Sequence, residues 1–249
     1  MFAMALDEFV LDAGVEILFD TQVVAPVMEQ KQCVGLLVEN KRGRGLYRAR
    51  AVIDATGDAD IFCRAGAPCV TGQNYMTYLA YRADMESAAS ALSEKNIIHA
   101  RKWTLLGSGP RGNGHPEGVP LISGTTAEDV TQYVLTGRKM MLDSMRNEDR
   151  FARDLSILPT MAQFRTTRHI VGAYSVQESD LCRRLPDSIA AVADFLTAGE
   201  WYEIPYRALY SPEYPNLWTA GRTVSADGWA WVVVRVIPGS ACSGQAAGL

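Results

Sequence analysis

The sequence predicts an α/β fold built on a parallel sheet, with an antiparallel meander as one of the crossovers. Two apolar runs, Ala51–Ala55 and Leu217–Ala220, each end at a glycine turn and indicate strands buried on both faces. A third parallel strand is expected at Val15–Phe19. Between residues 23 and 50, three short segments separated by turn residues predict a three-stranded meander, over Val23–Met28, Val34–Val38 and Leu46–Arg50.

Helical spacing of apolar residues marks the helices. Met1–Ala13 carries one apolar face and stops at Gly14. A small-residue helix is expected to begin after Pro238, and Pro186 is expected to open another that ends at Gly199. Thr125 with Glu128 forms a candidate capping box for a helix that would bury five apolar residues, namely Val130, Tyr133, Val134, Met141 and Met145.

The residue pattern between residues 72 and 158 differs from that of the flanking sequence. A strand at Tyr75–Ala83 and a short helix at Glu86–Glu94 precede Trp103–Gly124, which is rich in Gly and Pro and predicts loop with short strands. We therefore expect two regions. Residues 1–71 and 159–249 form the main domain, and residues 72–158 form an inserted substrate or cap region.

Composition narrows the function classes. The 249 residues carry a net charge of −4, which gives no electrostatic basis for binding nucleic acid. No apolar run approaches the roughly 20 residues needed to span a bilayer, and no signal peptide precedes the first helix. Five cysteines without a Cys-x-x-Cys pair indicate reduced thiols, so a cytoplasmic location is expected.

Two patterns that suggest sites are better explained as loops. Gly107–Gly112 matches the dinucleotide fingerprint G-x-G-x-x-G, but the prolines that follow prevent a helix from starting there. Asp54, Asp58 and Asp60 lack the remaining ligands of a calcium loop, and the three histidines are isolated. We expect no metal site.

The two glycine turns are the more specific signal. Thr56-Gly57-Asp58 follows one buried strand, and Ala220-Gly221-Arg222 follows the other. In an open α/β sheet, ligands bind in the crevice at the carboxyl ends of the strands. The helix expected after Pro238 starts with Gly, Ser and Ala, so its backbone can approach a flat or anionic ligand closely.

Several stretches resemble the FAD-dependent oxidoreductase family, a branch of the FAD/NAD(P)-binding superfamily that includes fumarate reductase-like flavoproteins. Val52–Asp60, followed by Arg64–Pro68, is similar to the family's second nucleotide-fold motif. Arg165–Gly172 resembles its Arg-Glu-Ser-Arg-Arg-Ile-x-Gly stretch, with Thr166 and His169 in place of the Glu and the second Arg of the motif. Its closing FAD motif is matched by Ile204–Leu209, Asn216–Asp227 and Arg235–Gly248.

The resemblance implies a Rossmann-like FAD-binding fold with FAD as cofactor. On the diphosphate and adenosine side, backbone of Ala55, Thr56, Gly57 and Asp58 would lie close to the cofactor. The remaining implied contacts are Gly221, Arg222, Ser225 and Asp227 near the ribityl and phosphate groups, and Ser243, Gly244 and Gln245 at the pyrimidine edge of the flavin. Arg165, Arg168 and His169 would lie on the substrate side, since arginine suits carboxylates and histidine titrates near neutrality. For these three, a structural ion-pair cluster is the alternative.

The family's opening strand–G-x-G-x-x-G–helix unit is not found in this sequence, which leaves three hypotheses for function. In the first, the protein transfers hydride between flavin and a small organic substrate, for which a carboxylate is the candidate. In the second, it is a truncated non-catalytic remnant of a flavoprotein that acts as an association module and forms homo-oligomers through an exposed sheet edge. An NAD(P)-binding partner of a larger complex is a third, weaker hypothesis.

Overall fold

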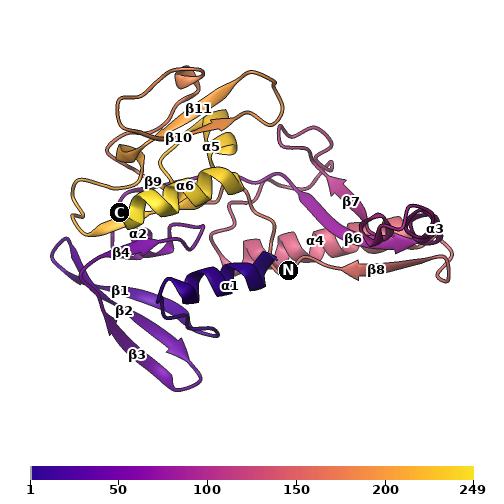
Figure 1. The fold of residues 1–249 in the computed structure, drawn as a ribbon, viewed down its shortest axis with the longest axis horizontal. Coiled ribbons are helices and arrows are strands. Elements are labelled where there is room, and N and C mark those ends of the chain that lie inside the picture. Colours follow the sequence, from indigo (N-terminus) through magenta and orange to yellow (C-terminus); the bar gives the residue numbers. More distant parts are fainter. Residues whose placement is uncertain (1) are drawn as a thin grey trace.

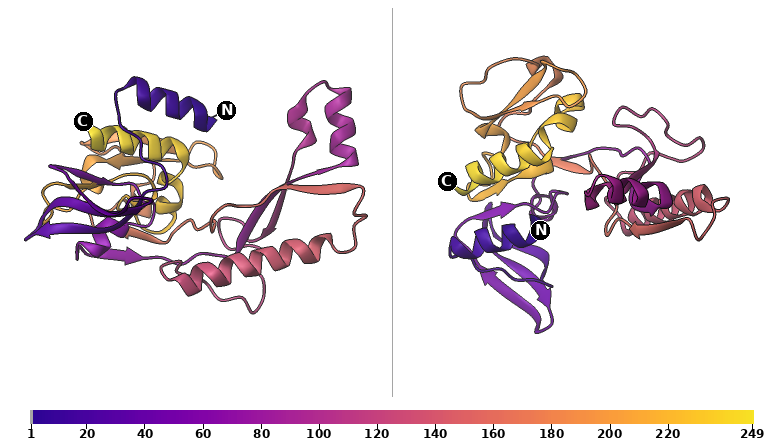
Figure 2. Two further views of the ribbon diagram at one scale, coloured as in Figure 1. Left: turned by 90° about the horizontal axis from the view of Figure 1, so that it is seen from below. Right: turned by 45° about the vertical axis from the view of Figure 1, so that its right-hand side comes forward.

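The computed structural model describes residues 2–249, which form two lobes (Figure 1). The larger lobe contains both ends of the described chain. The smaller lobe extends away from it, as the turned views show (Figure 2). The predicted first helix is observed as α1 (Phe2–Asp12), and Gly14 after it has a φ of +74°, a left-handed conformation that suits glycine. Met1 lies outside the described residues.

The meander prediction is confirmed. Strands β1 (Gln22–Glu29), β2 (Gln32–Asn40) and β3 (Gly43–Arg48) pair antiparallel in sequence order. Asn216, from the distant C-terminal part, donates to the carbonyls of Cys33 and Arg50 and accepts from the Cys33 N–H. This buried amide fastens the meander to the strand that begins at Leu217.

The parallel sheet is smaller than predicted. Strand β4 (Val52–Asp54) pairs in parallel with β12 (Leu217–Thr219), and these two make up the parallel sheet of residues 2–249. The expected strand at Val15–Phe19 is wrong: the segment is irregular, because no described strand lies beside it to accept its hydrogen bonds. The fold is therefore mixed α/β with several small sheets. Self-association through a sheet edge stays a prediction.

The C-terminal part of the larger lobe is built around a buried apolar cluster. Helix α5 (Gly228–Val234) packs in this cluster with strands β10 (Ser188–Ala193) and β11 (Trp201–Pro205), and α6 (Ile237–Gly248) lies against β10. The helix expected between Pro186 and Gly199 is wrong, since these residues form β10 and a turn. Pairing with β11 outweighs the helix propensity of the alanines.

The smaller lobe is a three-stranded sheet with a long helix beside it. Strand β6 (Thr77–Asp84) lies between β7 (Lys102–Gly107) and β8 (Arg153–Ile157), and α4 (Ala127–Met145) packs on β6 at Gly137. A Cβ at Gly137 would come within 2.1 Å of the Tyr78 ring, so glycine permits this close approach. The capping side chain of α4 is Thr126, one residue later than predicted.

Of the side chains expected to be buried by α4, Tyr133, Met141 and Met145 are, whereas Val130 is 38% exposed. Helix α3 (Met85–Ser93) and the 3₁₀ turn at Ile97–Ala100 complete the lobe. Two further elements, β5 (Cys69–Thr71) and β9 (Arg168–Ile170), pair antiparallel where the chain leaves and re-enters the larger lobe. Among residues 2–249, no helix combines the length and the apolar character needed to cross a bilayer.

Candidate functional site

The loop after β4 is shaped by one buried carboxylate. Asp54 is 1% exposed and accepts hydrogen bonds from the N–H and the hydroxyl of Thr56, at 3.1 and 2.7 Å. Its second oxygen accepts from the N–H groups of Ile61 and Phe62 in α2 (Asp60–Arg64), at 2.9 and 3.1 Å. Asp54 therefore fixes both the loop and the start of the following helix, which is a structural use for this acid.

An arginine from the second glycine turn closes over the first. Gly57 has a φ of +81°, and its carbonyl accepts a hydrogen bond from the Arg222 Nε. The Arg222 Nη2 donates to the Asp58 carboxylate at 2.7 Å. The carboxyl ends of β4 and β12 are thus joined through side chain and backbone. Of the three acids considered as metal ligands, the third, Asp60, pairs with Arg168, and residues 2–249 contain no cluster suited to a metal ion.

Helix α6 begins directly beside these turns. The buried hydroxyl of Ser243 accepts from the Gly221 N–H at 2.9 Å and donates to the Ser240 carbonyl. At Gly244, a Cβ would meet no atom within 4 Å. The helix is therefore held against the turn by Ser243, while Gly244 faces open space.

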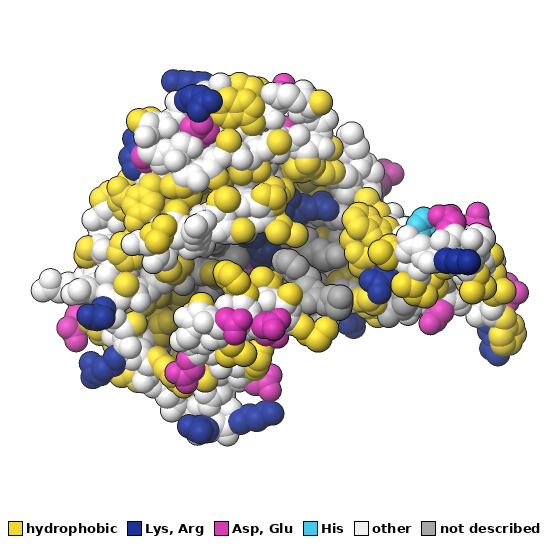
Figure 3. Space-filling view, in the orientation of Figure 1, with side chains coloured by type: hydrophobic (Ala, Val, Ile, Leu, Met, Phe, Trp, Pro, Cys, Tyr) yellow, Lys and Arg dark blue, Asp and Glu magenta, His cyan; other side chains and the backbone are white. Residues whose placement is uncertain are grey.

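These elements enclose a cleft of about 410 Å³. It is lined by Ala55, Gly57, Ala220, Gly221, Arg222, Arg235, Ser240 and Gly244. The structure thus brings together five of the residues predicted to bind cofactor: Ala55, Gly57, Gly221, Arg222 and Gly244. Basic side chains are visible in the hollow between α6 and α1 (Figure 3).

The other predicted cofactor contacts lie around the cleft rather than in its lining. Thr56 and Asp58 support the first turn, and Ser243 supports the second. Ser225 accepts from the Gly172 N–H, and Asp227 accepts from the Ser175 hydroxyl at 2.6 Å. The last predicted contact, the side chain of Gln245, is exposed on α6.

Arg235 is a residue of the cleft that the sequence analysis did not single out as a site. Its Nε is buried and has no hydrogen-bond partner in the described structure. Burial lowers the pKa of Arg235 to about 10, and the positive charges of Arg165 and Arg222 act in the same direction. Arg165 and Arg222 therefore both lie close enough to act on the charge of Arg235, and of these three arginines only Arg222 has an ion-pair partner among residues 2–249. Such a cluster favours an anion.

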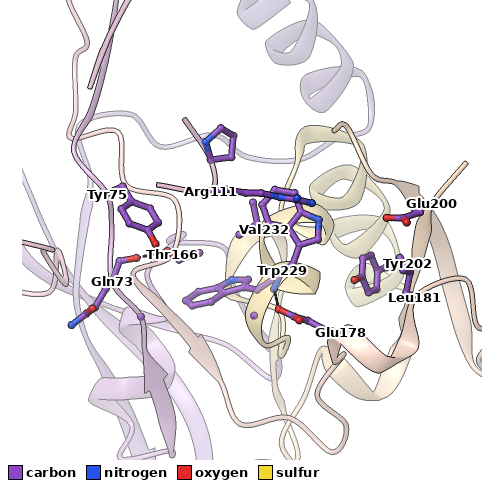
Figure 4. Close-up of a pocket in the computed structure, with 14 residues that line it drawn as sticks. Gln73, Tyr75, Arg111, Thr166, Glu178, Leu181, Glu200, Tyr202, Trp229 and Val232 are labelled. Atoms are coloured by element: carbon purple, nitrogen blue, oxygen red, sulfur yellow. Dashed lines mark hydrogen bonds between the residues drawn. The ribbon is translucent and has the colours of Figure 1, made fainter. Parts of the chain in front are cut away.

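A second, larger cavity of about 690 Å³ opens between the two lobes (Figure 4). The smaller lobe contributes Arg111 on the loop after β7, and Gln73 and Tyr75 line the cavity from the irregular segment between β5 and β6. The larger lobe contributes aromatic and acidic residues, namely Glu178, Glu200, Tyr202, Trp229 and Trp231. The sequence analysis missed all of these, because they come from five separate segments and form no local motif.

The three predicted substrate-side residues are dispersed. Arg165 donates to the Thr77 hydroxyl at 3.0 Å and lines a cavity of about 60 Å³ that shares several residues with the larger one. Arg168 instead contacts Asp60 at 2.5 Å and the Cys63 Sγ at 3.0 Å. Their catalytic assignment stays a prediction.

His169 is 1% exposed, with its Nδ1 2.8 Å from the Ile170 carbonyl and its ring edge-on to Trp231. Burial lowers the pKa of His169, against the opposing effects of the Ile170 hydrogen bond and the nearby Asp227. The Nε2 has no hydrogen-bond partner in the described structure and lies 3.6 Å from the Asp227 carboxylate. The imidazole is therefore neutral near pH 7.

Comparison with known proteins places the chain in a family. Neither the curated proteins nor the solved structures provide a match. The family model for FAD dependent oxidoreductases matches residues 1–81 and 114–249, which include both glycine turns, α6 and Arg165–Gly172, and it leaves residues 82–113 uncovered. The chain belongs to the FAD-dependent oxidoreductase family, and its cofactor is FAD.

Proposed function

We propose that FAD binds in the cleft between the two glycine turns and α6, and that a small organic carboxylate binds in the larger cavity. The observation that carries the proposal is the lining of the cleft, where small residues meet two arginines. When bound, FAD supplies a two-electron acceptor or donor for hydride transfer. The protein binds and orients both partners and sets the charge around them.

The small residues of the cleft fit a flat cofactor held by backbone. Gly244 presents open space where any side chain would project, and at Gly221 a Cβ would meet only the Ser240 side chain, at 3.5 Å. Gly57 has a positive φ, and a Cβ there would approach the Arg222 guanidinium at 3.1 Å. A residue with a Cβ would therefore disturb the arginine that closes the cleft.

The charge of the cleft fits an anionic cofactor. Arg222 and Arg235 both line it, and Arg165 lies near enough to depress the pKa of Arg235. A buried guanidinium without an acceptor is costly, so an anionic or carbonyl-rich ligand that accepts from the Arg235 Nε would relieve that cost. The diphosphate and the pyrimidine carbonyls of FAD offer such acceptors.

Helix α5 is the common wall of the cleft and the cavity. Trp229 and Trp231 face the cavity, whereas Arg235, directly after the helix, faces the cleft. Arg165 lies between the two spaces, with charge interactions toward Arg235 and a position beside Gln73 and Tyr75. We assign Arg165 to the carboxylate of the substrate, because it has no carboxylate partner among the described residues.

A pair of glycine variants on α6 tests the cofactor site. Gly244→Val places a branched side chain in the cleft, whereas Gly248→Val, four residues on, places one where no atom lies within 4 Å and outside the cleft lining. We expect the wild type and Gly248→Val to bind added FAD near 1:1, measured by flavin absorbance after gel filtration. Gly244→Val should bind none while keeping its circular dichroism spectrum.

Two outcomes separate the hypotheses for function. FAD retention by Gly244→Val would refute the placement of α6 against the cofactor. A wild-type chain that takes up no FAD would refute binding by this chain and support the non-catalytic association module, whose mark would be a higher mass in light scattering.

A further inference from the structure

The end of the large cavity around Trp229 is rich in carboxylates. The Trp229 N–H donates to the Glu178 Oε1 at 2.7 Å, and its indole Nε1 donates to the Asp194 carboxylate (Figure 4 shows the first of these bonds). Glu200 also lines this end and makes no side-chain hydrogen bond or ion pair within residues 2–249. Two acids therefore accept hydrogen bonds from Trp229, one at its backbone and one at its indole, and a third lines the same cavity.

The electrostatic potential around Tyr202, at this end of the cavity, is negative. Burial raises the pKa of Tyr202, and the negative charges of Glu178, Asp194 and Glu200 raise it further. At Asp194, burial acts to raise the pKa, but hydrogen bonds from Trp229 and from backbone N–H groups outweigh it and leave the pKa lowered. The acid therefore stays ionised, and this end of the cavity attracts cations.

The protein already places a cation there. The Arg111 guanidinium lies over the Trp229 ring, with its Cζ 4.5 Å from the ring centroid. Arg111 makes no hydrogen bond or ion pair with another residue of 2–249, and its side chain is exposed. An aromatic face beside carboxylates is a favourable environment for a guanidinium or an ammonium group. The contact shows which kind of group the indole accepts.

Arg111 lies on a loop that is fastened at its base. The Ser108 N–H donates to the Met76 carbonyl at 2.7 Å, and the Gly109 N–H donates to the Asn113 carbonyl at 2.8 Å. The loop is part of residues 82–113, which the family model does not cover. The side chain can leave the indole while the base of the loop stays in place, because the cation–π contact and the charge of Asp194 attract it but no hydrogen bond or ion pair within residues 2–249 fixes it.

We propose that this end of the cavity is a subsite for an ammonium group of the substrate, and that Arg111 fills the subsite until that group displaces it. The inference rests on the proposed function in taking this cavity as the substrate site. With Arg165 on the carboxylate and Trp229, Glu178 and Glu200 on the ammonium group, the substrate class is an aminocarboxylate. The volume of about 690 Å³ accommodates such a molecule.

The test compares three probes that differ only in their end groups: hexylammonium, hexanoate and 6-aminohexanoate, titrated calorimetrically into the full chain. Arg111→Gln removes the internal competitor, so it should bind hexylammonium about tenfold more tightly than the wild type. Replacing both Glu178 and Glu200 by Gln should weaken hexylammonium binding by about the same factor and leave hexanoate unchanged. The matched control is Arg101→Gln, which removes the cation–π contact of Arg101 with Tyr81 in the smaller lobe.

Unchanged hexylammonium affinity in Arg111→Gln, or a loss of hexanoate binding in that variant, would overturn the inference. The second result would make Arg111 an anion-binding residue. Arg111→Lys keeps the charge and should behave as the wild type. Failure of the proposed function is distinguishable: a chain that binds hexylammonium but no FAD refutes only the cofactor assignment, and one that binds FAD but no hexylammonium refutes only the ammonium subsite.

Discussion

The Arg222 guanidinium donates to the Asp58 carboxylate at 2.7 Å and so connects two loops that are 164 residues apart in sequence. Asp58 follows β4, and Arg222 follows β12. The same guanidinium also donates to the carbonyls of Gly57 and Phe164. This one side chain connects both loops at the cleft, so we expect its partner acid Asp58 to affect FAD binding there.

Asp58→Asn should weaken both the fold and the cofactor site. The pair is partly exposed, with 30% exposure at Asp58 and 22% at Arg222, so we expect a loss of about 1 kcal/mol in the free energy of unfolding. FAD affinity should fall because Arg222 loses its anchor. Urea unfolding and FAD titration measure the two effects. The control variant Asp20→Asn breaks a largely exposed ion pair with Lys41, so it should change neither the free energy of unfolding nor the FAD affinity. Equal effects in the two variants would contradict the role of Asp58.

Arg165 and Arg168 are predicted to respond differently to removal of charge. Arg165→Gln should weaken hexanoate binding about tenfold, because a charged hydrogen bond to the carboxylate is lost. Arg168→Gln breaks a contact with Asp60 and Cys63, so it should cost about 2 kcal/mol of stability and leave hexanoate affinity unchanged. Calorimetry and urea unfolding separate the two. Loss of hexanoate binding in Arg168→Gln would instead indicate that Arg168 binds the substrate carboxylate.

Burial of His169 predicts a pH dependence of stability. Its pKa in the folded state lies below the ordinary 6.5, so the unfolded chain binds more protons just below that pH. The free energy of unfolding should therefore fall as the pH drops below about 6.5 and level off below the folded-state pKa. In His169→Gln the slope in this window should flatten, whereas in the exposed control His99→Gln it should persist. Stability that increases as the pH falls through this window would exclude a neutral buried imidazole.

The local sequence pattern was sufficient to predict elements whose hydrogen bonds are made within one continuous segment. The meander and α1 follow from turn residues and helical spacing, and both are observed. The segment Ser188–Ala193 carries alanines and helical spacing but forms a strand, because Trp201–Pro205 pairs with it. Val15–Phe19 has the composition of a strand and is not one, since strand formation needs a neighbour. In both cases the deciding contact comes from a distant part of the chain.

The same distinction explains the candidate site. The two glycine turns and the small residues of α6 are local signals, and five of the predicted residues line the cleft. Arg235 carried a weak signal, as the lone charge that ends the apolar run Trp229–Val234. The cavity residues carried none, because Glu178, Glu200 and Trp229 meet only through tertiary packing. The G-x-G-x-x-G match was correctly interpreted as a loop, yet its Arg111 contacts Trp229.

Arg222 is also connected, through its backbone, to a residue that lines the second cavity. Its carbonyl accepts a hydrogen bond from the indole Nε1 of Trp231, which lines the large cavity, while its guanidinium lines the cleft. Arg222 therefore interacts both with the cleft and with the wall of the large cavity. By thermodynamic linkage, any ligand that alters FAD affinity by displacing Trp231 must have its own affinity altered by FAD through the same factor. A ligand that moves Trp231 would in this way couple the occupancy of the two spaces through the Arg222 carbonyl.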